Sequence, residues 1–327
     1  MSVLRKARAP GMARPFSRVF LPAARVFMAA SAMAGLCLFP SPDEARSGTG
    51  SEKPVVFVSV APQRYFVRRI AADTLDVRIM APPGASPATY EPRPRQMAAL
   101  SKAKIYFAIG VPFEKIWLKK IAASNPDMRI VDTSAGVEKK PMDVFHDHHH
   151  GHDHESGAPG VLMDPHIWTS PPLVAKQARH ILAALGEMDP GRRPFYEKNA
   201  AAFIKRLEEL DADFRKIFKK STGMGFMVFH PSWGYFARAY GLRQIPVEVE
   251  GKEPKAPQLK QLILKAGRMG VKVIFAQPQF SSKSAERVAR EIGARVVFAD
   301  PLAENWFQNM RETAAKFQQA AREESPK

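Results

Sequence analysis

Cysteine is almost absent from this chain, with Cys37 as its only example among 327 residues. Because no cysteine follows position 37, the chain downstream of it has no internal disulfide bond and no thiolate metal ligand. Any metal bound there has to be held by histidine, aspartate or glutamate side chains.

Long apolar runs are also scarce. The stretch from Val26 to Phe39 follows a basic segment and is too short for a comfortable membrane span, which is typical of the core of a signal peptide. We therefore expect residues 1–45 to be a signal peptide and the protein to be periplasmic, or extracytoplasmic and membrane-associated. Lipidation at Cys37 is conceivable, but Leu36 before it is a poor fit to the small residue that such a signal prefers.

Acidic residues are outnumbered, with 32 Asp and Glu against 49 Lys and Arg and a formal net charge of +17. Basic charge often indicates a nucleic-acid partner. The positive residues here are spread through amphipathic segments, and no nucleic-acid motif is present. We expect a basic-surfaced monomer that binds no nucleic acid.

Histidine is concentrated in one place. Six of the nine histidines fall within one short run, interleaved with Asp147, Asp153 and Glu155. They are His146, His148, His149, His150, His152 and His154. Neutral imidazole binds zinc, copper and nickel, so the run predicts accessory metal binding in a solvated loop at 141–160. A polar spacer or a tag is the alternative, and the internal position with interleaved acids argues against a tag.

The remaining pattern alternates short β-branched and aromatic runs with amphipathic helical segments. Such alternation predicts an α/β fold with mostly parallel sheets and helices on both faces. We expect an N-terminal lobe at 54–170, a linking helical region at 171–223 and a C-terminal lobe at 224–327. Apolar spacing predicts one helix of more than six turns within the linking region. A ligand would bind in the crevice between the lobes, beyond the carboxyl ends of the strands.

Three short segments outside the histidine run carry metal-binding residue types. They are MDPHIW with His166, VFHP with His230 and VVFADPL with Asp300. The last two residues follow apolar strands and should project into the crevice. A histidine or aspartate at a strand end is, taken alone, more often a structural residue.

Together these segments resemble the metal-specific substrate-binding proteins of ABC importers, the zinc and manganese class. The likeness covers about residues 54–322 and includes PPGASPATYEPRPRQ, VFHPSWGYFARAYGL and IFAQPQFSSKSAERVAREIG. The resemblance implies that His166, His230 and Asp300 bind the metal, and that the partners are an ABC permease and its ATPase.

The chain departs from this family at Ala88, where members usually carry a histidine. Alanine cannot coordinate, so three ligands carry over, whereas zinc prefers four in a tetrahedron. Water, a second oxygen of Asp300, Glu91 or a histidine of the loop is a candidate for the fourth position.

Zinc is the expected cargo, because a histidine stands at position 230, where manganese-type members carry a glutamate. The predicted function is extracytoplasmic capture of Zn(II) for delivery to the permease, with no reaction catalysed. Alternatives are a manganese or other divalent-metal protein of the same class, or a metal buffer that binds mainly through the loop. A zinc hydrolase is disfavoured, because the chain has no HExxH motif and Glu91 is the one nameable candidate for a general base.

Overall fold

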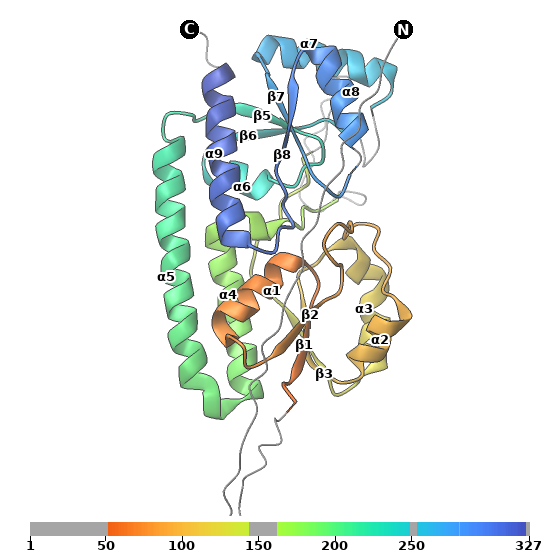
Figure 1. The fold of residues 1–327 in the computed structure, drawn as a ribbon, viewed down its shortest axis with the longest axis vertical. Helices are drawn as coiled ribbons and strands as arrows, with labels where there is room; N and C mark the ends of the chain where they lie inside the picture. Colours follow the sequence, from red (N-terminus) through yellow and green to blue (C-terminus); the bar gives the residue numbers. More distant parts are fainter. Residues whose placement is uncertain (1–51, 144–161, 249–253, 281, 325–327) are drawn as a thin grey trace, which may run out of the picture. The chain divides into compact units, whose positions relative to one another are not determined.

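Two sheets of four parallel strands form the frame of this computed structural model, which describes residues 52–143, 162–248, 254–280 and 282–324 (Figure 1). The strand orders are β2-β1-β3-β4 and β6-β5-β7-β8. The first sheet contains β1 (Val55–Val58), β2 (Asp76–Ile79), β3 (Ala103–Ala108) and β4 (Arg129–Asp132). The second contains β5 (Gly225–Val228), β6 (Arg243–Pro246), β7 (Val273–Ala276) and β8 (Arg295–Phe298).

Helices connect the strands, as parallel pairing requires. Along the chain, the helices between the strands of the first sheet are α1 (Ala61–Ala71), α2 (Pro94–Leu100) and α3 (Pro112–Ser124). Between the sheets come η1 (Ile167–Thr169), α4 (Pro171–Met188), η2 (Pro190–Arg192) and α5 (Arg193–Phe218). The last are α6 (Gly234–Ala239), α7 (Ala256–Met269), α8 (Ser282–Ile292) and α9 (Trp306–Glu324).

This architecture confirms the predicted α/β fold with parallel sheets and a long helix between them. Helix α5 has 26 residues, which is about seven turns. The 3₁₀ turn η2 separates it from α4, and there Asp189 accepts a hydrogen bond from the backbone N–H of Arg192 at 3.2 Å. Proline stands in the first turn of both long helices, where its missing N–H costs nothing.

One hydrophobic core runs through both sheets. It extends from Val55 on β1 to Ala320 on α9, so the two lobes share their apolar interior. On β5 the side chains alternate, as strand geometry dictates: Phe226 and Val228 join this core, and Met227 packs into a second cluster with α7 and α8.

Helix α5 contributes to that core along its whole length. Near its start Phe203 packs on Phe66 of α1, with ring centroids 6.0 Å apart. Near its end Phe214 packs on Phe236 of α6 at 5.6 Å. The helix therefore contacts both lobes with one apolar face.

Buried hydrogen bonds also join the lobes. The indole N–H of Trp168 donates to the carbonyl of Pro301 at 2.7 Å, and the indole N–H of Trp306 donates to the carbonyl of Trp168 at 2.7 Å. Arg64 of α1 pairs with Glu304 in the segment before α9. These bonds tie the segment that follows His166 to the segment that follows Asp300.

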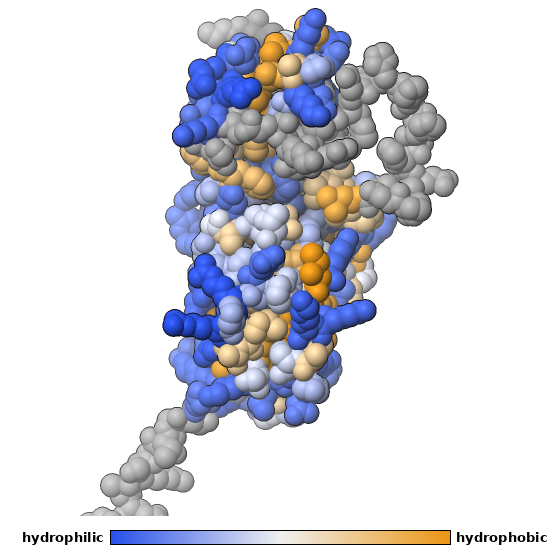
Figure 2. Space-filling model, turned by 90° about the vertical axis from the view of Figure 1, so that its right-hand side faces the viewer, coloured by the Kyte–Doolittle hydropathy of each residue, from blue (hydrophilic) through white to orange (hydrophobic). Residues whose placement is uncertain are grey.

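On the face shown in Figure 2, apolar groups are scattered among hydrophilic ones. Over the described parts of the chain, no helix combines the length and the apolar character needed to span a membrane. The predicted signal peptide at 1–45 and the six clustered histidines lie outside the described residues.

The shared core predicts a large stability cost for a substitution within it. Phe203 is 1% exposed, so Phe203→Ala should lower the free energy of unfolding by about 3–5 kcal/mol through lost burial and a residual cavity. Urea denaturation of the mature chain measures this. The control is Phe195→Ala, because Phe195 lies on the same helix and is 42% exposed. Equal losses for both variants would contradict the assigned core.

Candidate metal centre

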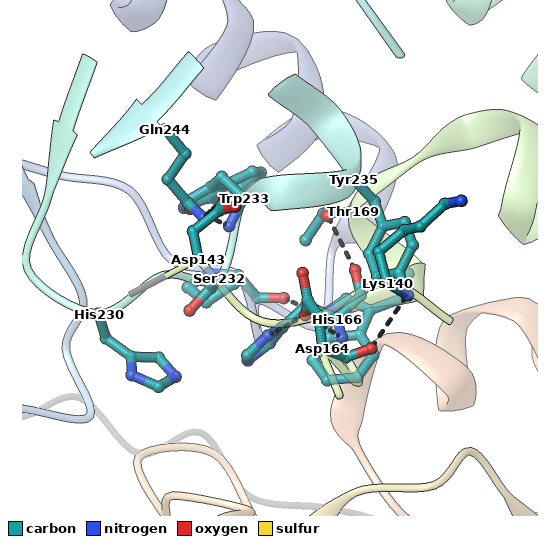
Figure 3. Close-up of polar contacts among 12 residues, drawn as sticks. Lys140, Asp143, Asp164, His166, Thr169, His230, Ser232, Trp233, Tyr235 and Gln244 are labelled. Atoms are coloured by element: carbon teal, nitrogen blue, oxygen red, sulfur yellow. Dashed lines mark hydrogen bonds and ion pairs between the residues drawn. The ribbon is translucent and has the colours of Figure 1, made fainter. Parts of the chain in front are cut away.

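The structure brings two of the three predicted ligands together. His166 lies immediately before η1, and His230 lies two residues beyond β5. Their ring centroids are 5.3 Å apart, with an interplanar angle of 74°. Figure 3 shows the two imidazoles facing each other. Residues 64 positions apart in the chain thus meet because the carboxyl end of β5 opens toward the η1 segment.

This separation fits one shared metal ion. Zinc–nitrogen bonds of about 2.1 Å place each ring centroid about 3.2 Å from the metal, so two imidazoles on a tetrahedral zinc have centroids about 5 Å apart. The observed 5.3 Å matches that expectation. The pair is therefore spaced as two ligands of one zinc ion would be.

Asp164 fixes the orientation of His166. One carboxylate oxygen, Oδ1, accepts from the ring Nδ1 at 2.8 Å and from the backbone N–H of His166 at 2.9 Å. Because a carboxylate only accepts hydrogen bonds, Nδ1 carries the proton and Nε2 keeps its lone pair. The other oxygen, Oδ2, faces Arg238 at 3.3 Å. This arrangement presents Nε2 as the metal-binding atom.

Burial acts on the protonation of His166. It lowers the pKa of this imidazole from the ordinary 6.5, while the hydrogen bond and charge of Asp164 partly oppose the shift. A lowered pKa means that the folded chain holds the ring neutral to lower pH than a free imidazole. Neutral imidazole is the form that binds metal, so burial favours binding.

Glu248 has the corresponding role beside His230. Pairing of the β6 segment with β5 continues past Pro246, and the backbone N–H of Glu248 donates to the carbonyl of Phe229 at 3.1 Å. Its carboxylate Oε1 lies 2.7 Å from Nδ1 of His230, which leaves Nε2 available. Both histidines therefore show the carboxylate–imidazole arrangement that accompanies metal ligands.

Asp300 lies two residues beyond β8, at the same edge of the second sheet as His230. Its Oδ1 accepts from the backbone N–H of Leu302 at 2.9 Å and from the amide Nε2 of Gln279 at 2.8 Å. Its backbone is held by Asn309, whose Nδ2 donates to the Asp300 carbonyl at 2.7 Å. Asp300 is thus fixed beyond the carboxyl edge of the second sheet.

The structure does not assemble a complete ligand set. Within the described ranges, no three side chains of His, Cys, Asp or Glu lie close enough together to hold a metal ion. Glu91 and Ala88 are both exposed, and Ala88 lies in the turn at 87–89. His166 and His230 form the pair, and the other ligands remain predictions.

The described residues also define both ends of the histidine-rich segment. Pro141 and Met163 form an antiparallel bridge, and the N–H of Met142 donates to the carbonyl of Leu162 at 2.8 Å. The N–H of Asp164 then donates to the carbonyl of Lys140 at 2.8 Å. The segment therefore starts and ends beside the residue that orients His166.

Sequence reasoning missed the two carboxylates that orient the histidines. Asp164 is visible in the Asp-Pro-His motif, where an acid two residues before a histidine can reach its ring. Glu248 gives a weaker signal, because it approaches His230 only through the pairing of β6 with β5.

Comparison with known proteins identifies the family to which this chain belongs. Residues 56–320 match the family described as zinc-uptake complex component A, periplasmic. The chain is 30% identical over 246 residues to the high-affinity zinc uptake system protein ZnuA of Bacillus subtilis, covering 75% of this chain and 77% of that one. It is 26% identical to the zinc-binding lipoprotein AdcA of Streptococcus pneumoniae, covering 81% of this chain but only 55% of that one.

Solved structures show the same fold. A crystal structure of ZnuA superposes with a TM-score of 0.75 at 43% identity, covering 82% of this chain and 99% of that one. A zinc-bound ZnuA with residues 138–173 of its own sequence deleted gives 0.73 at 43% identity, covering 82% and 98%. The resemblance inferred from the motifs is confirmed: the chain belongs to the ZnuA family of periplasmic zinc-uptake components.

Proposed function

We propose that this protein captures Zn(II) outside the cytoplasmic membrane and delivers it to an ABC permease with its ATPase. His166 and His230 supply two Nε2 ligands and Asp300 supplies a carboxylate oxygen. The single observation that carries the proposal is the imidazole pair, 5.3 Å apart, with each Nδ1 held by a carboxylate. Zinc is cargo here, and the protein catalyses no reaction.

The donor set favours zinc over manganese. Two imidazoles suit zinc, whereas manganese prefers carboxylate, carbonyl and water oxygens. Asp300 adds one negative charge to two neutral rings. The charge of Asp164 is compensated by Arg238, and the charge of Glu248 lies on the far side of the His230 ring from Nε2. A small, strongly imidazole-binding dication fits this arrangement best.

The histidine-rich segment is an accessory in this proposal. Its described ends lie beside Asp164. We propose that its histidines raise the local zinc concentration or supply the fourth ligand. A buffer function would instead place nearly all zinc capacity in this segment.

Removing His230 should abolish tight zinc binding. His230→Ala deletes one of the two imidazoles. Zinc titration calorimetry should therefore show a loss of affinity greater than about 100-fold, which is the upper end of the loss when a residue that only orients a ligand is removed. The matched control is His180→Ala, because His180 is outside the pair and its ring contacts the carbonyl of Ala135 at 3.0 Å.

The same titrations in a chain lacking 144–161 separate transport from buffering. The deletion alone should leave one high-affinity site. If His230→Ala in this background binds zinc with unchanged affinity and stoichiometry, the proposed site is wrong. If the deletion removes nearly all zinc binding, the protein is a buffer.

Asp164→Asn tests the orientation of His166. The asparagine side chain keeps the size but loses the charge that supports the Nδ1 proton, so zinc affinity should fall about 10- to 100-fold. Asp143→Asn is the control, since Asp143 also faces Arg238, at 3.5 Å, and contacts Gln244 rather than an imidazole. Calorimetry measures both, and equal losses would assign the effect to the Arg238 contacts.

Ala88→His tests the fourth position. An imidazole at the position where the family carries one should complete the tetrahedron and tighten zinc binding about tenfold or more, equivalent to about 1.4 kcal/mol. Thr89→His places the same group on the adjacent exposed position of the turn and should have no effect. Unchanged affinity for Ala88→His would mean that another group already fills the fourth position.

A further inference from the structure

Two glutamines follow β7, the strand that lies between those preceding His230 and Asp300. The sheet order β6-β5-β7-β8 gives β7 one neighbour on each side. Gln277 and Gln279 are separated by Pro278 in the sequence Gln-Pro-Gln. Each glutamine contacts the residue beyond a different neighbouring strand, so the two amides serve different ligands.

Gln277 holds the backbone of His230. Its Nε2 donates to the His230 carbonyl at 2.6 Å, and its Oε1 accepts from the His230 N–H at 3.3 Å. Gln277 is 1% exposed. This amide therefore fixes the backbone position from which the His230 side chain extends, without contacting the ring.

Gln279 contacts the carboxylate of Asp300 itself. Its Nε2 lies 2.8 Å from Oδ1, and the backbone N–H of Leu302 lies 2.9 Å from the same oxygen. Because a carboxylate has no donor, the NH₂ group of the amide is the side that faces it. Oδ1 thus accepts two hydrogen bonds, and both are strengthened by its charge.

The backbone around Asp300 is held as well. Asn309 donates to the carbonyl of Asp300 at 2.7 Å, and Trp168 donates to the carbonyl of Pro301 at 2.7 Å. With the backbone fixed, the side chain can free Oδ1 only by breaking its bonds from Gln279 and Leu302. Oδ2 is therefore the oxygen of Asp300 that remains for a metal.

We propose that Gln279 is a specificity-determining residue that keeps Asp300 monodentate and so favours zinc over manganese. The inference rests on the proposed function, with Asp300 as a ligand. Zinc is satisfied by four ligands, whereas manganese prefers more oxygens around it, which a bidentate carboxylate would provide. Gln279 withholds that second oxygen. The fourth zinc ligand is then a group other than Oδ1 of Asp300.

Gln279→Met tests this, because methionine has similar length and no amide donor. With Oδ1 released by one of its two donors, Asp300 can bind in a bidentate manner. We expect the ratio of manganese to zinc affinity, measured by titration calorimetry of the mature chain, to rise about tenfold. Co(II) supplies a second readout, since its visible absorption is strong in tetrahedral sites and weak at higher coordination number. That absorption should weaken in the variant.

Gln308→Met is the matched control. Gln308 makes the same kind of bond, from Nε2 to Oε1 of Glu312 at 2.8 Å, on the exposed side of α9. It should change neither the affinity ratio nor the Co(II) spectrum. Gln279→Ala serves as a second variant, and circular dichroism verifies that each variant is folded.

The outcomes separate this inference from the proposed function. If His230→Ala abolishes zinc binding but Gln279→Met and Gln279→Ala leave the affinity ratio and the Co(II) spectrum unchanged, Gln279 does not set specificity. Equal loss of zinc and manganese affinity also overturns the inference, because it assigns Gln279 a structural role alone. If His230→Ala leaves zinc binding intact, the proposed function itself fails.

Discussion

The hydrogen bond that each imidazole Nδ1–H donates to a carboxylate is the interaction on which the proposed metal centre depends. An imidazole offers a lone pair only at the nitrogen that carries no proton, and an acceptor at Nδ1 decides which nitrogen that is. Asp164 does this for His166 and Glu248 for His230. Both carboxylates are buried, so neither is free to turn toward solvent. The fold holds the two imidazoles that these carboxylates orient with their ring centroids 5.3 Å apart.

To maintain that distance, the segment that carries His166 and the segment that carries His230 must keep fixed positions relative to each other. Helix α5 packs against both lobes, and one apolar core includes residues of both. The indole hydrogen bonds of Trp168 and Trp306 add directional contacts next to the ligands. Because these bonds are buried, breaking one leaves an unpaired polar group, and this penalty resists separation of the His166 and Asp300 segments.

Much of this was predictable because it is encoded locally. The alternation of apolar runs with helical segments predicted the parallel α/β fold, and apolar spacing predicted α5 as one long helix. The pairing of His166 with His230 followed from the family resemblance, since a strand-end histidine taken alone is more often structural. What escaped prediction depends on lateral contacts. Glu248 reaches His230 only through the register of β6 on β5, and the hold of Gln279 on Asp300 depends on a side-chain conformation. Neither contact can be inferred from the spacing of residues in the sequence.

The charges around the pair suggest why a dication is favoured. Asp164 has Arg238 as a cationic partner at 3.3 Å, so its charge is compensated within the protein. Among the described residues Glu248 pairs with the His230 ring rather than with an arginine or lysine, and its Oε2 is buried there without a hydrogen-bond partner. A buried carboxylate with incomplete pairing is costly. A positive ion bound at Nε2 of His230 places charge across the ring from Glu248 and offsets that cost. At the proposed site, binding would therefore gain free energy from Glu248 as well as from the ligands, which links the strength of capture to a residue that does not touch the metal.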